Sequence, residues 1–354
     1  MNQSTKNEAV TGKVSRVAWR EAGLRYHATS FHLRNRFGGR VHRVSLDARM
    51  TCPNVDGSAG VGGCSFCNNR SFSPSRRLNV QDIGRQLDDG IRRLQTRYQC
   101  ERFIAYFQPG TNTYAPVSQL RECWTQALSH PQVVGMAIGT RADCVPDDVL
   151  DLLSEFAAKT VLTVEFGLQT IHDRSLDWMN RGHDHQTFLD AIARSRGRGF
   201  EIGAHVILGL PGESREQMLA TADELARLDL DAVKIHNLYA VKHTRLAQQV
   251  LGGEVSLMER GEYIETLIDF LERLPPRMIV DRIAGDAPAE FLIGPAWCLD
   301  KPGLHAAVRT ALQRRDTWQG KRYRDHQPKG TIYRGCEKNG TEVLNKWIHG
   351  IVRG

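Results

Sequence analysis

Short apolar runs recur along this chain and are separated by longer amphipathic stretches. The runs are VHRVSL (41–46), FIAYF (103–107), GMAIGT (135–140), VLTVEFG (161–167), IGAHVILG (202–209) and AVKIHNLYA (232–240), with MIVDRI (278–283) as a seventh. They are largely apolar rather than alternating, which is typical of parallel strands covered on both faces. Amphipathic stretches lie between them at 80–98, 146–158, 213–228 and 258–274, several opening with Pro, Asp or Ser at a capping position.

This alternation predicts a βα unit repeated about six times. A right-handed succession of such units gives either a barrel or a doubly wound sheet. In both architectures the functional residues gather at the carboxyl ends of the strands. The loops that follow the apolar runs are therefore where a site is expected.

Length and composition fit a globular enzyme. The chain has 354 residues, 41% of them hydrophobic and 25% charged, and contains no apolar run long enough to span a bilayer. Residues 1–18 are polar and lack the apolar core of a secretory signal, so we expect a disordered lead-in to a cytoplasmic protein. The folded part is expected at 19–320, and a basic tail at 321–354.

The net charge of +7 has two interpretations. Lys and Arg side chains that neutralise phosphates favour a polyanionic partner, but a modest positive charge also aids solubility alone. The region after about Arg309 is either a solvated extension or a basic contact surface. It carries Arg314, Arg315, Lys321, Arg322, Arg324 and Lys329 close together.

The loop after the first predicted strand carries the most specific chemistry. TCPNVDGSAGVGGCSFCNN places Cys52, Cys64 and Cys67 around a glycine-rich segment with no fourth cysteine nearby. Eight irregularly spaced cysteines in a chain of this length do not indicate a disulfide framework, so free thiolates are available for metal. A structural zinc site normally has four ligands, and here zinc would need a distant His or Cys. Three thiolates on a four-iron four-sulfur cluster would leave one iron open to chelate S-adenosylmethionine.

On these residues the chain resembles the radical S-adenosylmethionine (SAM) superfamily. CPN-x-DG followed by GGC-x-FC is similar to the YhcC-like family within it, which is related to the catalytic subunit of the elongator complex. The interval from Cys52 to Cys64 is longer than the usual superfamily spacing and marks this subgroup. The resemblance covers roughly 19–320 and implies a partial (β/α)6 TIM-like barrel with a 4Fe-4S cluster on Cys52, Cys64 and Cys67.

The resemblance also implies a set of SAM-binding residues at successive strand ends. Those after the second, third and fourth strands are Gln108, Thr111, Asn112, Arg141, Glu165 and Gln169. Ala142 departs from the proline usual in the family segment after the third strand. Ile207 and Gly209, on the fifth strand and its turn, are expected to line an adenine pocket. A lone polar residue at a strand end is more often a structural hydrogen-bond partner, but its recurrence at several ends favours a ligand role.

The sixth and seventh strand ends are expected to face the substrate. The residues predicted to act there are Lys234, His236, Arg282 and Asp286. A single histidine in a strand is usually structural, so these assignments depend on the family pattern.

The function implied is reductive cleavage of SAM to a 5′-deoxyadenosyl radical, supplied with electrons by a donor such as flavodoxin or ferredoxin. The elongator relationship and the positive charge favour transfer RNA, modified at the wobble uridine side chain. Two alternatives stay open. One is a radical modifier of a small metabolite or peptide, and the other is an iron-sulfur or zinc binding scaffold without enzymatic activity.

Overall fold

The computed structural model of the chain describes residues 18–77 and 80–324. The expected lead-in (1–18) and basic tail (321–354) therefore fall, except at their inner ends, outside the described residues. No helix within these ranges is long and apolar enough to cross a membrane.

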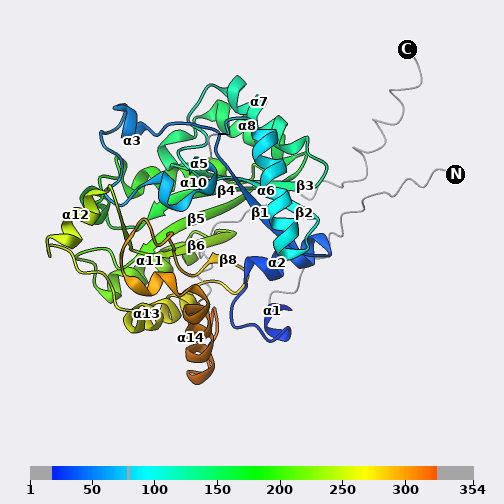
Figure 1. The fold of residues 1–354 in the computed structure, drawn as a ribbon. Helices are drawn as coiled ribbons and strands as arrows, with labels where there is room; N and C mark the ends of the chain where they lie inside the picture. Colours follow the sequence, from blue (N-terminus) through cyan, green and yellow to red (C-terminus); the bar gives the residue numbers. More distant parts are fainter. Residues whose placement is uncertain (1–17, 78–79, 325–354) are drawn as a thin grey trace, which may run out of the picture. The chain divides into compact units, whose positions relative to one another are not determined.

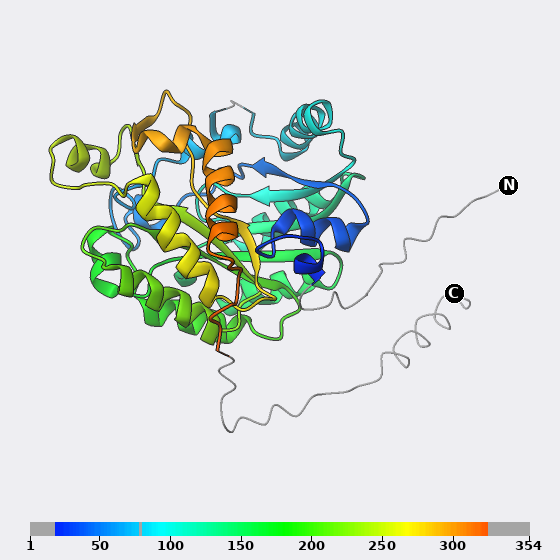
Figure 2. The same ribbon diagram turned by 90° about the horizontal axis from the view of Figure 1, so that it is seen from below.

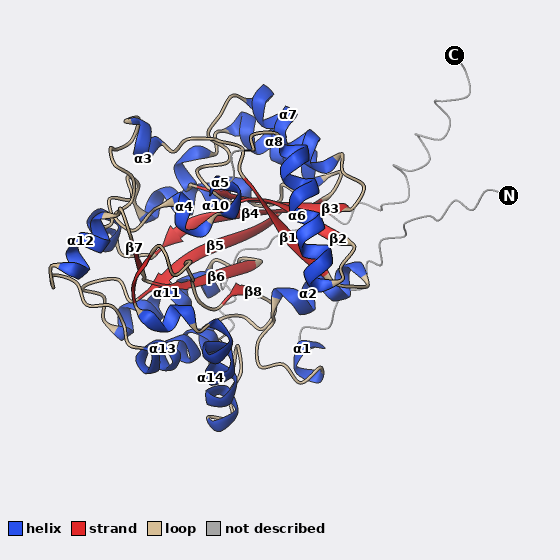
Figure 3. Ribbon diagram, in the orientation of Figure 1, coloured by secondary structure: helices blue, strands red, loops and turns tan. Residues whose placement is uncertain are grey.

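Seven parallel strands of the described chain form one sheet, in which each strand pairs with the next along the sequence (Figure 3). Their bounds are β1 Val41–Leu46, β2 Arg102–Phe107, β3 Val133–Thr140, β4 Val161–Gln169, β5 Glu201–Leu208, β6 Ala232–Asn237 and β8 Ile279–Arg282. Each strand coincides with one of the predicted apolar runs. A two-stranded antiparallel pair, β7 (Ala240–Val241) with β9 (Leu292–Gly294), was not predicted.

The sheet is curled, so that its first and last strands approach each other without pairing. Arg43 on β1 donates to Asp281 on β8 at 2.6 Å, and an isolated bridge joins Ala28 to Val280. This arrangement confirms the predicted partial barrel and excludes the doubly wound sheet.

Helices follow the strands and cover the outside of the sheet (Figure 1). The longer ones are α2 Thr29–Phe37, α6 Ile83–Tyr98, α7 Val117–Leu128, α8 Asp147–Ala157, α10 His185–Ser195, α11 Arg215–Arg227, α13 Arg260–Arg273 and α14 Lys301–Arg314. The short ones are α1 Ala18–Glu21, α3 Pro53–Asp56, α4 Asn69–Phe72, α5 Pro74–Arg77, α9 Asp173–Trp178 and α12 Arg245–Leu251. Several begin at the caps expected from sequence, such as the Ser214 capping box of α11 and Asp82 at α6.

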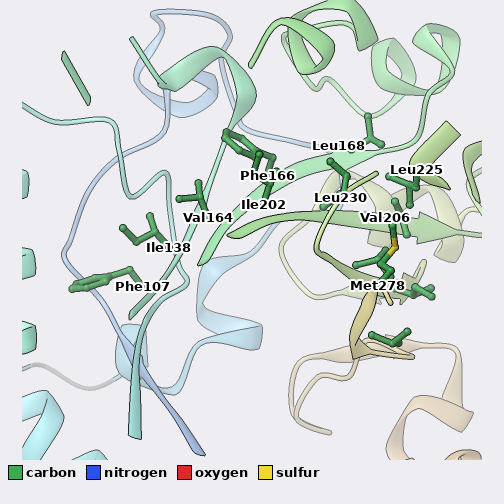
Figure 4. Close-up of a cluster of buried hydrophobic side chains, with 14 of the residues drawn as sticks. Phe107, Ile138, Val164, Phe166, Leu168, Ile202, Val206, Leu225, Leu230 and Met278 are labelled. Carbon is green, nitrogen blue, oxygen red and sulfur yellow. The ribbon is translucent and has the colours of Figure 1, made fainter. Parts of the chain in front are cut away.

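The hydrophobic core lies between the outer face of the sheet and these helices. Figure 4 shows part of it, with Phe107, Ile138, Val164 and Phe166 side by side on neighbouring strands. Successive side chains of a strand point to opposite faces of the sheet, so the side chains between these core residues point into the barrel. On β4, for example, Val164 and Phe166 belong to the core, whereas Thr163 and Glu165 face inward.

Three arginines near the end of the described chain, Arg314, Arg315 and Arg322, are paired with acidic side chains. α14 packs beside α13 (Figure 2), and Arg315 donates to Asp269 and to Glu272. Arg322 lies 2.7 Å from Glu272. The described residues of the expected basic tail thus form part of the body of the fold.

Candidate functional site

The three predicted cluster cysteines lie around one cavity. Cys52, Cys64 and Cys67 all line a hollow of about 200 Å³ at the carboxyl ends of the strands. Cys52 precedes α3, and a tight turn joins Cys64 to Cys67, whose N–H donates to the Cys64 carbonyl at 2.9 Å. Gly62 and Gly63 have φ of 82° and 76°, a conformation that side chains other than glycine rarely adopt, so the loop depends on them.

Two nitrogen donors approach the sulfur of Cys64. Asn54 Nδ2 lies 3.6 Å and Arg181 Nη1 3.8 Å from Cys64 Sγ. Asn180 holds the same loop through its Nδ2, which donates to Gly63 O at 2.9 Å. Side chains of the turn after α9 thus hold the cysteine loop in place.

The arrangement of the three thiols is compatible with a cluster. Within residues 18–77 and 80–324, no three His, Cys, Asp or Glu side chains are placed to hold one metal ion. A four-iron cluster spans a larger volume, and three thiols around a shared hollow suit it.

Five of the predicted SAM-binding residues line the same cavity, and three do not. The five are Gln108, Thr111, Arg141, Gln169 and Ile207. Asn112 instead joins two strand ends, donating to Phe107 O at 3.1 Å and Gly139 O at 3.0 Å. Gly209, with φ of 87°, forms a turn beside Met258, and Glu165 lies beneath the cavity.

Arg141 and Gln169 are held differently in the cavity wall. Arg141 makes a two-point contact with Asp143, with nitrogen–oxygen distances of 2.8 and 2.7 Å. Burial opposes ionisation of Asp143, but the guanidinium outweighs it and keeps the pKa of that carboxyl below its usual value. Gln169 is only 9% exposed, and its side-chain amide has no hydrogen bond within the described chain. That amide is therefore available to a ligand.

The floor of the cavity is polar and highly ordered. Tyr106, His205 and Lys234 line it from three strands and all contact Glu165 beneath them. Tyr106 donates to Glu165 at 2.9 Å, Lys234 Nζ donates at 2.6 Å, and His205 Nε2 lies 2.7 Å away. Lys234 also donates to the Tyr106 hydroxyl at 2.5 Å.

Arg43 completes this network from below. Its guanidinium lies 2.7 Å from Glu165 and 2.6 Å from Asp281. Burial alone would raise the pKa of Glu165, but Lys234 and Arg43 hold it well below its ordinary value. Burial lowers the pKa of Lys234 below its usual value, and the charge of Glu165 opposes that shift. The two groups form an ion pair at 2.6 Å.

The predicted substrate-side residues are brought together in part. Lys234, His236 and Arg282 line the cavity. Burial, followed by the charge of Arg282, holds the pKa of His236 well below its usual value, so the ring is neutral. Asp286 lies outside the lining, where it contacts Arg282 at 3.4 Å and Lys301 at 3.3 Å.

Some residues of the site were not identified from the sequence. They are Arg43, Asn54, Tyr106, His205, Tyr239 and Asp281. Most interrupt an otherwise apolar strand, which is the signal that would have found them. Arg181, in the turn after α9, also contacts Cys64 and has no neighbour in sequence that would indicate this contact.

Two family models match the chain. Residues 59–225 match the Radical SAM superfamily and residues 230–314 the Radical_SAM C-terminal domain. The chain is also 40% identical over 297 residues to the uncharacterized protein YtqA of Bacillus subtilis, covering 84% of this chain and 92% of that protein. It belongs to the radical SAM superfamily. The first match includes Cys64 and Cys67 and begins just after Cys52.

Further comparisons place this radical SAM protein more closely. Protein YhcC of Escherichia coli is 37% identical over 267 residues, covering 75% of this chain and 85% of that protein, which confirms the predicted family. The tRNA uridine(34) acetyltransferase of Dehalococcoides mccartyi is 28% identical over 185 residues, which cover 51% of this chain and 39% of that protein. Radical SAM enzymes bind a 4Fe-4S cluster and SAM, which confirms both predicted cofactors.

A solved structure shares the fold of this radical SAM protein. The archaeal Elp3 of Methanocaldococcus infernus, with an N-terminal deletion, superposes with a TM-score of 0.60 at 18% identity. The similarity covers 79% of this chain and 64% of that one. It confirms the barrel architecture predicted from the apolar runs.

Proposed function

We propose that this radical SAM enzyme modifies transfer RNA, at the side chain of the wobble uridine. The observation that carries the proposal is the lining of the cavity. Four basic side chains face it and none of its described lining residues is Asp or Glu; the four are Arg141, Arg181, Lys234 and Arg282. The distant similarity to enzymes named tRNA uridine(34) acetyltransferase, and a net charge of +7, support a nucleic-acid substrate.

In this proposal the cysteine loop holds the cluster on Cys52, Cys64 and Cys67. Held there, the cluster would supply reductive cleavage of bound SAM to methionine and a 5′-deoxyadenosyl radical, the chemistry needed to take a hydrogen atom from a substrate carbon. A donor such as flavodoxin or ferredoxin provides the electron.

The chain's own residues bind and orient SAM. Gln169 offers an unpaired amide, and Arg141 is fixed by Asp143 in position to attract a carboxylate. Gln108, Thr111 and Ile207 complete the wall, while Asn112 and Gly209 shape the strand ends that carry it. Phe66 and Leu238 line the cavity too, and their apolar surfaces exclude water from a reactive intermediate.

A basic rim beside the cysteine loop suits an RNA backbone. We define it as the exposed residues Arg70, Lys242 and Arg245, which have no acidic partner within the described chain. Asn68 Nδ2 donates to Lys242 O at 2.9 Å, which ties the segment after β7 to the loop of Cys67. Phosphates bound at this rim would leave an unstacked base near the cavity mouth.

The test is mass spectrometry of transfer RNA nucleosides from cells with and without the gene. Deletion should remove one modified nucleoside and accumulate its precursor. A wild-type copy should restore the modification, and a copy with Cys52, Cys64 and Cys67 changed to Ala should not. An unchanged nucleoside profile would exclude transfer RNA and favour a small metabolite or peptide as substrate.

A further inference from the structure

The far floor of the cavity contains hydrogen-bond donors without partners. His236 and Tyr239 line it, and neither side chain makes a hydrogen bond within the described part of the chain. Lys234 has three N–H bonds, of which two are directed at Tyr106 and Glu165. One donor of a side chain that is only 7% exposed is therefore left for a ligand.

The carboxylates that contact Lys234 and Arg282, Glu165 and Asp286, both lie outside the described lining of the cavity. The carboxylate of Glu165 contacts the side chains of Arg43, Lys234 and His205. Asp286 lies outside the lining and is shared between Arg282 and Lys301. The side chain of Arg282 is 30% exposed and belongs to the lining, so its guanidinium can reach a bound group.

The cavity also has basic side chains at its cysteine end, and these are different residues from those of the far floor. Arg181 lies beside Cys64, and Arg141 is linked to Arg181 O at 2.8 Å. Lys234 and Arg282, by contrast, come from paired positions of β6 and β8. Each end of the cavity therefore has two basic groups and can bind one anionic group of a ligand. The carboxylate of SAM accounts for the anionic group at the cysteine end.

We propose that the far floor, formed by Lys234, His236, Tyr239 and Arg282, binds an oxyanion of the substrate, a carboxylate or a phosphate. Two cationic groups with two neutral donors give charge-assisted hydrogen bonds, which are the strong ones in a water-poor site. The network beneath keeps Lys234 fixed, so the donors are preorganised. The proposal rests on the assignment of the cysteine end to the cluster and SAM, and it applies to an RNA or a small-molecule substrate.

The test is isothermal titration calorimetry of the anaerobically reconstituted protein with saturating SAM at constant ionic strength. The probes are acetate, inorganic phosphate and the neutral acetamide. At least one oxyanion should bind at one site per chain and acetamide should not. Arg282→Gln should weaken oxyanion binding at least tenfold, while Arg34→Gln, an exposed arginine on α2 of the described chain, should not change it.

Three results would overturn the proposal. One is equal binding of acetate and acetamide, and another is unchanged oxyanion affinity in Arg282→Gln. The third is oxyanion binding that disappears when SAM is added, because the floor would then belong to the carboxylate of SAM. Arg282 is chosen because Lys234→Met removes a buried ion-pair partner and can fail to fold. No RNA is present, so the outcome is independent of the nucleoside experiment.

Discussion

The ammonium of Lys234 lies 2.6 Å from Glu165 Oε2, at the centre of a network buried inside the barrel. Arg43 approaches the other carboxylate oxygen at 2.7 Å and also pairs with Asp281 at 2.6 Å, so two acids and two bases share the network. Removing one member of a buried pair leaves an uncompensated charge, which costs more than the pair itself contributes. We therefore expect Glu165 to support the floor of the cavity, and the role in SAM binding predicted for it is tested below.

Glu165→Gln should lower the free energy of unfolding by about 3–5 kcal/mol, because buried Lys234 then loses the carboxylate that compensates its charge, while Arg43 keeps Asp281. Chemical denaturation of the reconstituted protein measures this. Glu262→Gln, at an exposed position of α13, is the matched control and should change stability by less than about 0.5 kcal/mol. Adding Lys234→Met to Glu165→Gln should recover part of the stability, and a double variant no better than the single one would contradict the pairing.

Gln169→Ala should weaken SAM binding by about tenfold, which corresponds to the removal of one hydrogen bond to a ligand. Its stability should change little, because the side-chain amide has no partner within the described residues. Calorimetric titration with SAM measures the affinity, and Gln119→Ala, which removes an exposed amide on α7, is the control. The folded fraction of Glu165→Gln should bind SAM as the wild type does. Weaker SAM binding in Glu165→Gln but not in Gln169→Ala would reverse these assignments.

Anaerobically reconstituted protein should hold about four iron atoms per chain. Changing Cys52, Cys64 and Cys67 to Ala should abolish the bound iron and its visible absorbance while the fold is retained. Cys123→Ala, at a half-buried cysteine that does not line the cavity, should keep both. Stoichiometric zinc without iron in protein purified under anaerobic conditions would contradict the cluster assignment.

The sequence predicted the strands well because each one buries its outer face against helices. Runs such as VLTVEFG and IGAHVILG supply the apolar side chains seen in Figure 4, and the βα order leaves few topologies. The same runs were interpreted as almost uniformly apolar, so the polar positions that face the inside of the barrel were not recognised as a group. Arg43, Glu165 and Lys234 occupy inward positions of three different strands, and only the curl of the sheet brings them together.

The candidate site was predictable only where residues are close in sequence. Cys64 and Cys67 form a local motif, and their meeting with Cys52 depends on one loop. By contrast, Arg181 reaches Cys64 across 117 residues. Such interactions depend on which strand ends are neighbours and which way each side chain points, and neither is encoded in a local pattern.

The stability of the protein should fall as the pH drops below about 6.5, partly through His236. Burial holds the pKa of this ring well below its usual value, so the unfolded chain takes up a proton near pH 6.5 that the folded chain does not. The contribution of a depressed pKa is complete above that pH and decreases as the pH falls. At pH 5.5 one such histidine costs about 1.4 kcal/mol.

His236→Gln should therefore reduce the difference in unfolding free energy between pH 7.5 and pH 5.5 by about that amount. Denaturation at both pH values measures it. His243→Gln replaces an exposed imidazole and is the control. An equal pH dependence in His236→Gln and the wild type would mean that the ring is protonated in the folded state.

RNA binding should depend on salt and on the basic rim rather than on the arginines after α14. Each phosphate neutralised by Lys or Arg releases a condensed counterion, so affinity falls linearly on a double-logarithmic plot against salt. Arg315 and Arg322 are already paired with acidic side chains of α13, and a phosphate would have to displace those partners. The rim residues have no such competitor within the described ranges.

Changing Arg70, Lys242 and Arg245 together to Ala should weaken binding of all transfer RNAs alike and reduce the salt slope by about 0.7–0.9 for each phosphate that is no longer neutralised. Changing Arg315 and Arg322 to Ala is the matched control, because it removes similar charge elsewhere and should lower stability more than RNA affinity. Filter binding over a range of salt concentrations measures both slopes. If the rim variant keeps the wild-type salt slope while the control variant does not, the RNA is bound at the end of α14. If neither slope changes, the positive charge of the chain serves solubility and the substrate is a small molecule.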